Sequence, residues 1–134
     1  MEVRKSVRLL VVDEQQGYFE QVRDYAELCS HQFDIECAYA RTEVEARIKM
    51  KSFLPTVIMI DAHLPDVGDL RCIQDYQQGF APVIVTSDHR SIEIEEAARE
   101  NGAHAYVTKS DQPEELELLL FKISVIAGEI AEIH

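Results

Sequence analysis

Val57-Ile-Met-Ile-Asp61 places four consecutive apolar residues directly before a carboxylate. A short run that is apolar at every position is typical of a strand covered on both faces, as in a parallel sheet. Pro55 precedes the run and Pro65 follows it, so residues that favour turns bound it on both sides. We therefore predict a central parallel strand at residues 57–60, with Asp61 at its carboxyl end.

Other apolar runs and amphipathic stretches alternate on both sides of this strand. The predicted strands are residues 7–12, 35–39, 57–60, 82–87 and 105–107. The predicted helices are residues 16–30, 42–53, 70–78 and 91–101, and a long helix after Pro113. A regular alternation of this kind favours a parallel sheet with helices on both faces. We expect one α/β domain over residues 1–134, with its core at about residues 7–127.

Helical periodicity predicts which side chains face the sheet. The predicted inward residues are Phe19, Val22, Ala26 and Cys29 in the first helix, Val44, Ile48 and Phe53 in the second, Ile92 with Ala97 or Ala98 in the fourth, and Leu116, Leu119, Leu120, Ile123 and Ile126 in the last. Thr42 is predicted to cap the second helix, because Glu45 follows at the spacing of a capping box. Asp111 is predicted to cap the last helix.

Composition excludes several classes of protein. Acidic residues outnumber basic ones 25 to 13, for a net charge of −12, which repels nucleic-acid phosphates. No apolar run reaches the roughly 18 residues of a membrane span, and the first residues lack the apolar core of a secretory signal. The three cysteines, at positions 29, 37 and 72, suit neither a disulfide framework nor a zinc site. We expect a cytoplasmic protein without direct contact to nucleic acid or membrane.

Reactive side chains follow four of the five predicted strands. They are Asp13 with Glu14, Asp61, Ser87 and Lys109. Each alone has a simpler explanation, as a helix cap, a turn residue or a solvated charge. At the carboxyl edge of a sheet with strand order 2-1-3-4-5 they would meet at one site. Clustered carboxylates suit Mg²⁺, and a carboxylate on the central strand could attack phosphorus and become an acyl phosphate.

These residues resemble the receiver domain of response regulators in two-component signal transduction. The resemblance covers residues 7–127 and rests on the segments 9–14, 57–65, 82–87 and 102–109. It implies a flavodoxin-like (βα)5 fold with strand order 2-1-3-4-5. It also implies a phosphorelay function, in which a sensor histidine kinase or phosphotransfer protein donates a phosphoryl group to Asp61. Such a domain is a signalling switch and catalyses only its own phosphorylation and dephosphorylation.

The resemblance implies a role for each site residue. Mg²⁺ would be held directly by Glu14, Asp61 and the backbone carbonyl of His63, and mostly through water by Asp13. Lys109 would form an ion pair with the phosphoryl group. Ser87 would contact that group after activation, and Tyr106 would be the aromatic residue that turns inward. The rim of the site would be formed by His63, Asp88 and His89.

Several positions depart from the usual pattern of the family. The acid pair is Asp13-Glu14 rather than the commoner Asp-Asp or Glu-Asp, and the loop after Asp61 has its glycine at position 68 and its aspartate at 69. Asp88 stands where a small residue is usual. Ser110 replaces the usual proline, so the Lys109–Ser110 bond is either trans or held cis by tertiary contacts, since a cis bond there costs roughly 3–4 kcal/mol.

Three alternatives remain at the level of sequence. A degenerate receiver would dock partners without phosphorylation, although all the site groups are present. A phosphohydrolase of the haloacid-dehalogenase type usually needs an acid two residues after the nucleophile, where this chain has His63. A flavin protein of the same fold should have a Ser-, Thr- and Gly-rich loop after the first strand.

By family analogy, a downstream partner, an effector domain or a second copy would dock on the fourth and fifth helices.

Overall fold

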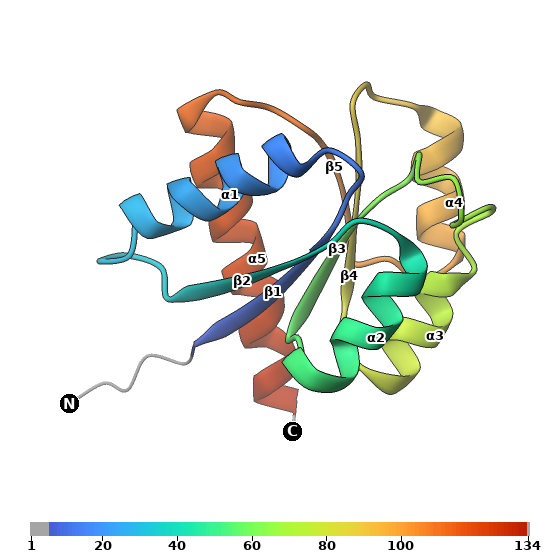
Figure 1. The fold of residues 1–134 in the computed structure, drawn as a ribbon, viewed down its shortest axis with the longest axis horizontal. Coiled ribbons are helices and arrows are strands. Elements are labelled where there is room, and N and C mark those ends of the chain that lie inside the picture. The colour runs from blue at the N-terminus through green and yellow to red at the C-terminus, as the bar shows by residue number, and fades with distance from the viewer. Residues whose placement is uncertain (1–5, 134) are drawn as a thin grey trace.

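The computed structural model describes residues 6–133, with side chains described to residue 128 (Figure 1). Five strands alternate with five helices. In chain order they are β1 (Val7–Val12), α1 (Gln16–Leu28), β2 (Ile35–Ala40), α2 (Glu43–Phe53), β3 (Val57–Asp61), α3 (Cys72–Gly79), β4 (Val83–Ser87), α4 (Ile92–Glu100), β5 (Ala105–Thr108) and α5 (Pro113–Ile133).

The strands form one parallel sheet in the order β2-β1-β3-β4-β5. Helices α1 and α5 cover one face, while α2, α3 and α4 cover the other (Figure 1). Strand order reverses between β1 and β3, and the carboxyl ends of these strands form the usual ligand site of such a sheet. The predicted flavodoxin-like architecture, with order 2-1-3-4-5, is confirmed.

Strand β3 divides its side chains between two hydrophobic cores. Val57 and Met59 pack into the core under α1 and α5, whereas Ile58 and Ile60 pack into the core under α2, α3 and α4. All five residues of β3 are buried, as the uniformly apolar sequence predicted. This burial on both faces fixes Asp61 at the edge of the sheet, next to the ends of β1 and β4.

Helices α1 and α5 show the predicted inward faces. The predicted residues Phe19, Val22, Ala26 and Cys29 are buried on the α1 side, and Leu116, Leu119, Leu120, Ile123 and Ile126 are buried on α5. Within residues 6–133, no helix combines the length and the apolar character that crossing a bilayer would require.

The prediction for the inner face of α2 was wrong for Val44 and Ile48, whereas Phe53 packs against the core under α2, α3 and α4 as predicted. Val44 and Ile48 are 61% and 68% exposed, and the buried residues are Glu43, Ala46 and Met50. Burial of Glu43 is made possible by the Tyr76 hydroxyl of α3, which donates a 2.8 Å hydrogen bond to Glu43 Oε1. The predicted Thr42 cap is confirmed, because its side-chain oxygen accepts from the Glu45 N–H at 3.1 Å.

Three further local predictions need correction. Ile92 is 67% exposed and was wrongly predicted as inward, whereas the predicted Ala98 is buried. Helix α3 begins at Cys72 rather than at Leu70, because Leu70 has a positive φ of 69° that no helix accommodates. Helix α5 begins at Pro113, so Gln112 rather than Asp111 precedes it, and the Gln112 carbonyl accepts from the Leu116 N–H. Every peptide bond of the described residues is trans, including Lys109–Ser110.

Candidate functional site

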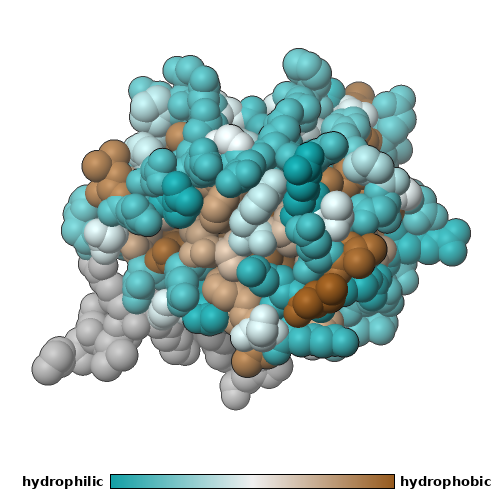
Figure 2. Space-filling view, viewed as in Figure 1, coloured by the Kyte–Doolittle hydropathy of each residue, from teal (hydrophilic) through white to brown (hydrophobic). Residues whose placement is uncertain are grey.

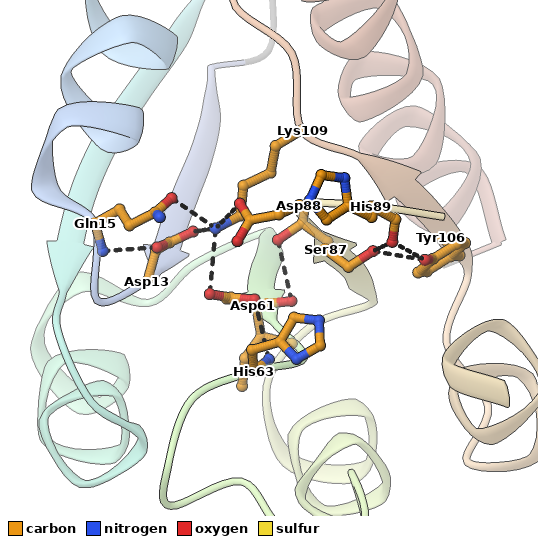
Figure 3. Close-up of polar contacts among 11 residues, drawn as sticks. Asp13, Gln15, Asp61, His63, Ser87, Asp88, His89, Tyr106 and Lys109 are labelled. Atoms are coloured by element: carbon orange, nitrogen blue, oxygen red, sulfur yellow. Dashed lines mark hydrogen bonds and ion pairs between the residues drawn. The ribbon is translucent and has the colours of Figure 1, made fainter. Parts of the chain in front are cut away.

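Four polar residues lie at the carboxyl edge of the sheet, and the side chains of three of them, Asp13, Asp61 and Lys109, converge (Figure 3). Parallel register places Val12 beside Ile60, Asp61 beside Thr86 and Ser87 beside Thr108. The residues at or after these strand ends are Asp13, Asp61, Ser87 and Lys109. The predicted meeting of these residues at one edge is therefore seen in the structure.

Lys109 is the centre of the cluster. Its Nζ lies 2.7 Å from Asp13 Oδ2 and 3.2 Å from Asp61 Oδ2. It also donates to Gln15 Oε1 at 3.2 Å and lies 3.6 Å from Asp88 Oδ1. The side chain of Lys109 is only 6% exposed, so these contacts form largely out of solvent. The ammonium thus bridges the carboxylates that end β1 and β3.

Burial and charge shift the pKa values of this cluster. Desolvation of Asp13 raises the pKa of its carboxyl, and this effect outweighs the opposing influence of the nearby Lys109 ammonium and of the hydrogen bond from the Gln15 N–H. Burial disfavours the charge of Lys109, but the close contact with Asp13 and the charges of Asp13 and Asp61 leave the pKa of Lys109 raised. One ammonium therefore faces the buried side chains of Asp13 and Asp61 and the half-exposed side chain of Asp88.

The donor set suits a hard divalent cation. Asp13 Oδ2 is buried and accepts no hydrogen bond of normal geometry, although Lys109 Nζ lies close to it. With the Asp61 carboxylate, this atom offers the carboxylate oxygens that Mg²⁺ prefers as donors. Glu14, which was predicted as a direct ligand, is exposed. Among residues 6–133, no three His, Cys, Asp or Glu side chains are already grouped as metal ligands.

Ser87 and Tyr106 are joined by a hydrogen bond. The two hydroxyl oxygens lie 2.5 Å apart, and the His89 carbonyl oxygen lies within reach of both, 2.6 Å from Ser87 Oγ and 3.3 Å from the Tyr106 hydroxyl. Because each hydroxyl has one proton, one donates to the other, and the one that accepts donates to the carbonyl. The Tyr106 oxygen also accepts from the Ser91 N–H at the start of α4, at 3.0 Å. The Ser87 hydroxyl is therefore directed toward β5 and α4 rather than toward Asp61 (Figure 3).

The three predicted rim residues surround the mouth of this cluster. Asp88 has a side chain that is 48% exposed, and the residues His63 and His89 are exposed. The His63 N–H donates to Asp61 Oδ1 at 3.0 Å, so the backbone of this loop orients the Asp61 carboxylate. The other Asp61 oxygen faces Lys109.

Sequence reasoning missed three residues of the site. Gln15 donates its N–H to Asp13 Oδ1 at 2.8 Å, in addition to its side-chain contact with Lys109. The Tyr39 hydroxyl donates to the Asp13 carbonyl at 2.6 Å, and the Tyr18 ring lies 5.2 Å from Lys109 Nζ. Burial and the charges of Asp13 and Asp61 raise the pKa of Tyr18. Only Gln15 had a signal in the sequence, which was its position directly after the Asp13-Glu14 pair.

Comparison with known proteins identifies the family. The family model of the response regulator receiver domain matches residues 9–121, which is most of the chain. The chain therefore belongs to the response regulator receiver domain family, whose members act as modules in two-component signalling and typically bind Mg²⁺ at the phosphorylation site. No curated protein is similar enough in sequence to count as a match.

Solved structures show the same fold. The signal receiver domain of an HD domain-containing protein from Pseudomonas fluorescens Pf-5 aligns with a TM-score of 0.80 at 18% identity, covering 98% of this chain and 96% of that one. A response regulator from Thermotoga maritima aligns with a TM-score of 0.78 at 21% identity, covering 92% and 99%. A response regulator receiver protein from Burkholderia phymatum gives 0.73 at 18% identity, covering 92% and 96%. These likenesses support the fold.

Proposed function

We propose that this protein is a phosphoacceptor switch in a two-component phosphorelay, with Asp61 as the residue that is phosphorylated. The observation that carries the proposal is the Lys109 ammonium, which is held between the Asp13 and Asp61 carboxylates at the edge of the sheet. An ammonium in this position can stabilise the negative charge of the carboxylate before transfer and that of a phosphoryl oxygen during transfer. The donor is a phosphohistidine of a sensor kinase or phosphotransfer protein.

In the proposed reaction, one oxygen of the Asp61 carboxylate attacks the phosphorus atom. The bond between phosphorus and the donor nitrogen breaks, the electron pair of that bond stays with the imidazole, and an acyl phosphate forms on Asp61. The His63 N–H and the Lys109 ammonium orient the carboxylate before attack. The protein is thus no enzyme in the usual sense, since it acts only on its own aspartate.

Mg²⁺ is the cofactor of the proposed reaction. The residues that would hold it are Asp13, Asp61 and the carbonyl of His63, and the exposed Glu14 would join them after its side chain turns toward Asp13. When bound, the ion offsets the negative charge of the phosphoryl oxygens. Lys109 would then move from Asp13 toward the phosphoryl group while keeping its contact with Asp61.

The proposed switch is an exchange of hydrogen bonds at Ser87. A Ser87 hydroxyl that turns to the phosphoryl group gives up the His89 carbonyl and the Tyr106 hydroxyl. Tyr106 keeps the His89 carbonyl as its acceptor and the Ser91 N–H as its donor, so its ring can settle further inward. Because Ser91 caps α4, this local exchange reaches the start of that helix.

The proposed setting is a single receiver domain over residues 1–134 that acts in the cytoplasm. Its output is contact with a downstream protein partner or an effector domain, and a homodimer would form through the faces of α4 and α5. Exposed Ile92 on α4 and exposed Leu118 and Phe121 on α5 supply apolar contacts for that surface. Nucleic acid and membrane are not direct partners, in keeping with the charge of −12.

Intact-mass measurement tests the proposal. The protein is incubated with Mg²⁺ and acetyl phosphate, and its mass should rise by one phosphoryl group. Asp61→Asn should remove the adduct, whereas the matched change Asp69→Asn, in an exposed aspartate of the following loop, should retain it. The same adduct on Asp61→Asn would overturn the assignment of the nucleophile. Absence of an adduct in the native chain would favour the degenerate receiver that only docks partners.

A further inference from the structure

The outward side of α2 carries an apolar surface. Val44 and Ile48 lie one helical turn apart and are 61% and 68% exposed. Figure 2 shows a hydrophobic patch where Figure 1 shows α2. Large apolar side chains this exposed on adjacent turns are a feature of interaction sites when they have polar borders.

Unpaired cations border this surface. The side chains of Arg41, Lys49 and Lys51 are exposed, and among residues 6–128 none of them forms an ion pair. Other arginines that pair with a nearby carboxylate are Arg8, Arg23, Arg47, Arg71 and Arg90, whereas exposed Arg99 on α4 forms no ion pair among residues 6–128. Residues 41–51 thus carry three unpaired cations against one exposed carboxylate, that of Glu45. The outward side of α2 is therefore more positive than the chain as a whole, whose net charge is −12.

Polar contacts fix this orientation of α2. Glu43 is buried, and its Oε1 accepts from the Tyr76 hydroxyl of α3 and from Arg47 Nε. Arg47 also reaches Asp75 of α3 at 3.3 Å. A rotation that buried Val44 and Ile48 would expose Met50 and break these contacts. The apolar residues are thus held in solvent by the packing of their own helix.

The first turn of α2 is also bound to the loop that follows Asp61. The Asp66 carboxylate accepts from the Glu43 N–H at 3.1 Å and from the Val44 N–H at 3.4 Å. Thr42 satisfies the next amide, so the start of the helix is fully capped. Asp66 lies five residues after Asp61 in the loop joining β3 to α3. A shift of this loop therefore acts directly on the backbone of Val44.

We propose that the α2 surface, formed by Val44, Ile48, Lys49 and Lys51, docks an acidic amphipathic helix of a partner protein, and that Asp66 couples this docking to the state of Asp61. Leucine-like side chains of the partner would cover Val44 and Ile48, and its carboxylates would meet the two lysines. A net charge of −12 opposes an anionic membrane as the occupant. The coupling, but not the docking, rests on the proposed phosphorylation of Asp61.

The docking is tested with a synthetic helix that carries leucine on one face and glutamate on the other. Its binding to the full chain is followed by fluorescence anisotropy at low salt. Ile48→Ser, and Lys49→Glu combined with Lys51→Glu, should each weaken binding by about tenfold or more. Leu28→Ser is the matched control, because Leu28 is 72% exposed at the end of α1, away from both α2 and the α4–α5 surface, and it should change binding by less than about twofold.

Three outcomes would overturn the docking proposal. They are failure of the native chain to bind the acidic peptide, equal binding of a peptide with lysine in place of glutamate, and equal losses in Ile48→Ser and Leu28→Ser. Recruitment to phosphatidylserine vesicles in place of the peptide would mean that the surface is a membrane site. Concentration-dependent polymers that Ile48→Ser abolishes would mean that it binds a second copy.

The coupling is tested by repeating the titration with Mg²⁺ and acetyl phosphate, with the adduct checked by intact mass. The affinity of the native chain should change by about threefold or more, and Asp66→Ala should remove this change while its adduct still forms. An adduct without a change of affinity in the native chain would overturn the coupling. Absence of an adduct would contradict the proposed function, and the docking would still be judged by the unphosphorylated titration.

Discussion

Lys109 Nζ lies 2.7 Å from Asp13 Oδ2, and the two side chains are 6% and 1% exposed. This contact joins β5 to β1 across the whole width of the site, although Asp13 and Lys109 are far apart in sequence. The same nitrogen contacts Asp61, so one ammonium holds together the ends of three strands. Its removal would leave two buried carboxylates without a cation, and this has consequences for stability.

We predict that Lys109→Met lowers the free energy of unfolding by about 3 kcal/mol at neutral pH, the usual cost of removing one partner of a buried ion pair. Urea denaturation followed by circular dichroism measures this change. Lys122→Met is the matched control: Lys122 lies on α5, forms no ion pair among the described residues and should cost much less. Equal losses in both variants would show that the contacts of Lys109 do not stabilise the fold.

The loss of unfolding free energy in Lys109→Met should depend on pH. The pKa of Asp13 determines whether this loss grows or shrinks as pH rises. Burial already holds this pKa above 3.8, and removal of the ammonium raises it further. The folded variant then binds a proton more tightly than the unfolded chain, so its stability falls as pH rises from about 4 through the folded pKa. The difference from the native chain should therefore be small at pH 4 and grow as pH rises.

Our second prediction concerns Mg²⁺. The ion should raise the melting temperature of the native chain, because it binds the folded state and offsets the charges of Asp13 and Asp61. Asp13→Asn should remove most of the rise, since Asp13 Oδ2 is the buried oxygen without a normal hydrogen bond. Glu14→Ala should remove less, because Glu14 begins as an exposed side chain. An undiminished rise in Asp13→Asn, measured by scanning calorimetry, would exclude Asp13 as a ligand.

The strand positions, and the presence of Asp13, Asp61, Ser87 and Lys109 at one edge of the sheet, could be predicted from short stretches of sequence. An apolar run such as Val57–Ile60 has few structural solutions, and a parallel sheet brings the residues at the strand ends to one edge. The face of α2 could not be predicted in this way. Its burial of Glu43 depends on Tyr76, which lies 33 residues away, and periodicity carries no information about such a partner.

The orientation of the side chains within the site also could not be predicted from local sequence. The position of Glu14 after β1 predicts its nearness to Asp13 and Asp61, but not the exposure of its side chain. In the same way, the sequence places Ser87 and Tyr106 on neighbouring strands without indicating the hydrogen bond between their hydroxyls. Tertiary packing decides which side chains pair in this way. Resemblance to a family indicates the general position of these side chains, but not their hydrogen bonds.

The third prediction addresses the Tyr106 hydroxyl. Tyr106→Phe removes the oxygen that joins Ser87, the His89 carbonyl and the Ser91 N–H. The free energy of local opening at the start of α4 should then fall by about 1 kcal/mol, which is the usual net contribution of a hydrogen bond. Amide hydrogen exchange at Ser91 and in the first turn of α4 measures it. Tyr39→Phe is the control, because its hydroxyl bonds the Asp13 carbonyl and should leave α4 unchanged.

The last prediction concerns Asp88, whose carboxylate stands at the mouth of the site, 3.6 Å from Lys109 Nζ. A phosphodonor is itself negative, and two like charges about 4 Å apart in an effective dielectric near 20 repel by roughly 4 kcal/mol. Because the Asp88 side chain is 48% exposed, solvent and salt should reduce this to about 1 kcal/mol, or about fivefold in rate. Asp88→Ala should therefore speed phosphorylation by acetyl phosphate.

Ionic strength separates this electrostatic effect from a change in packing. The gain in Asp88→Ala should shrink as salt rises, because screening already weakens the repulsion in the native chain. Asp111→Ala is the matched control, since Asp111 is an exposed aspartate at the outer edge of the same hollow and forms no ion pair with Lys109. Its rate should stay within about twofold of the native rate. Equal rates for Asp88→Ala and the native chain at low salt would show that Asp88 does not repel the donor.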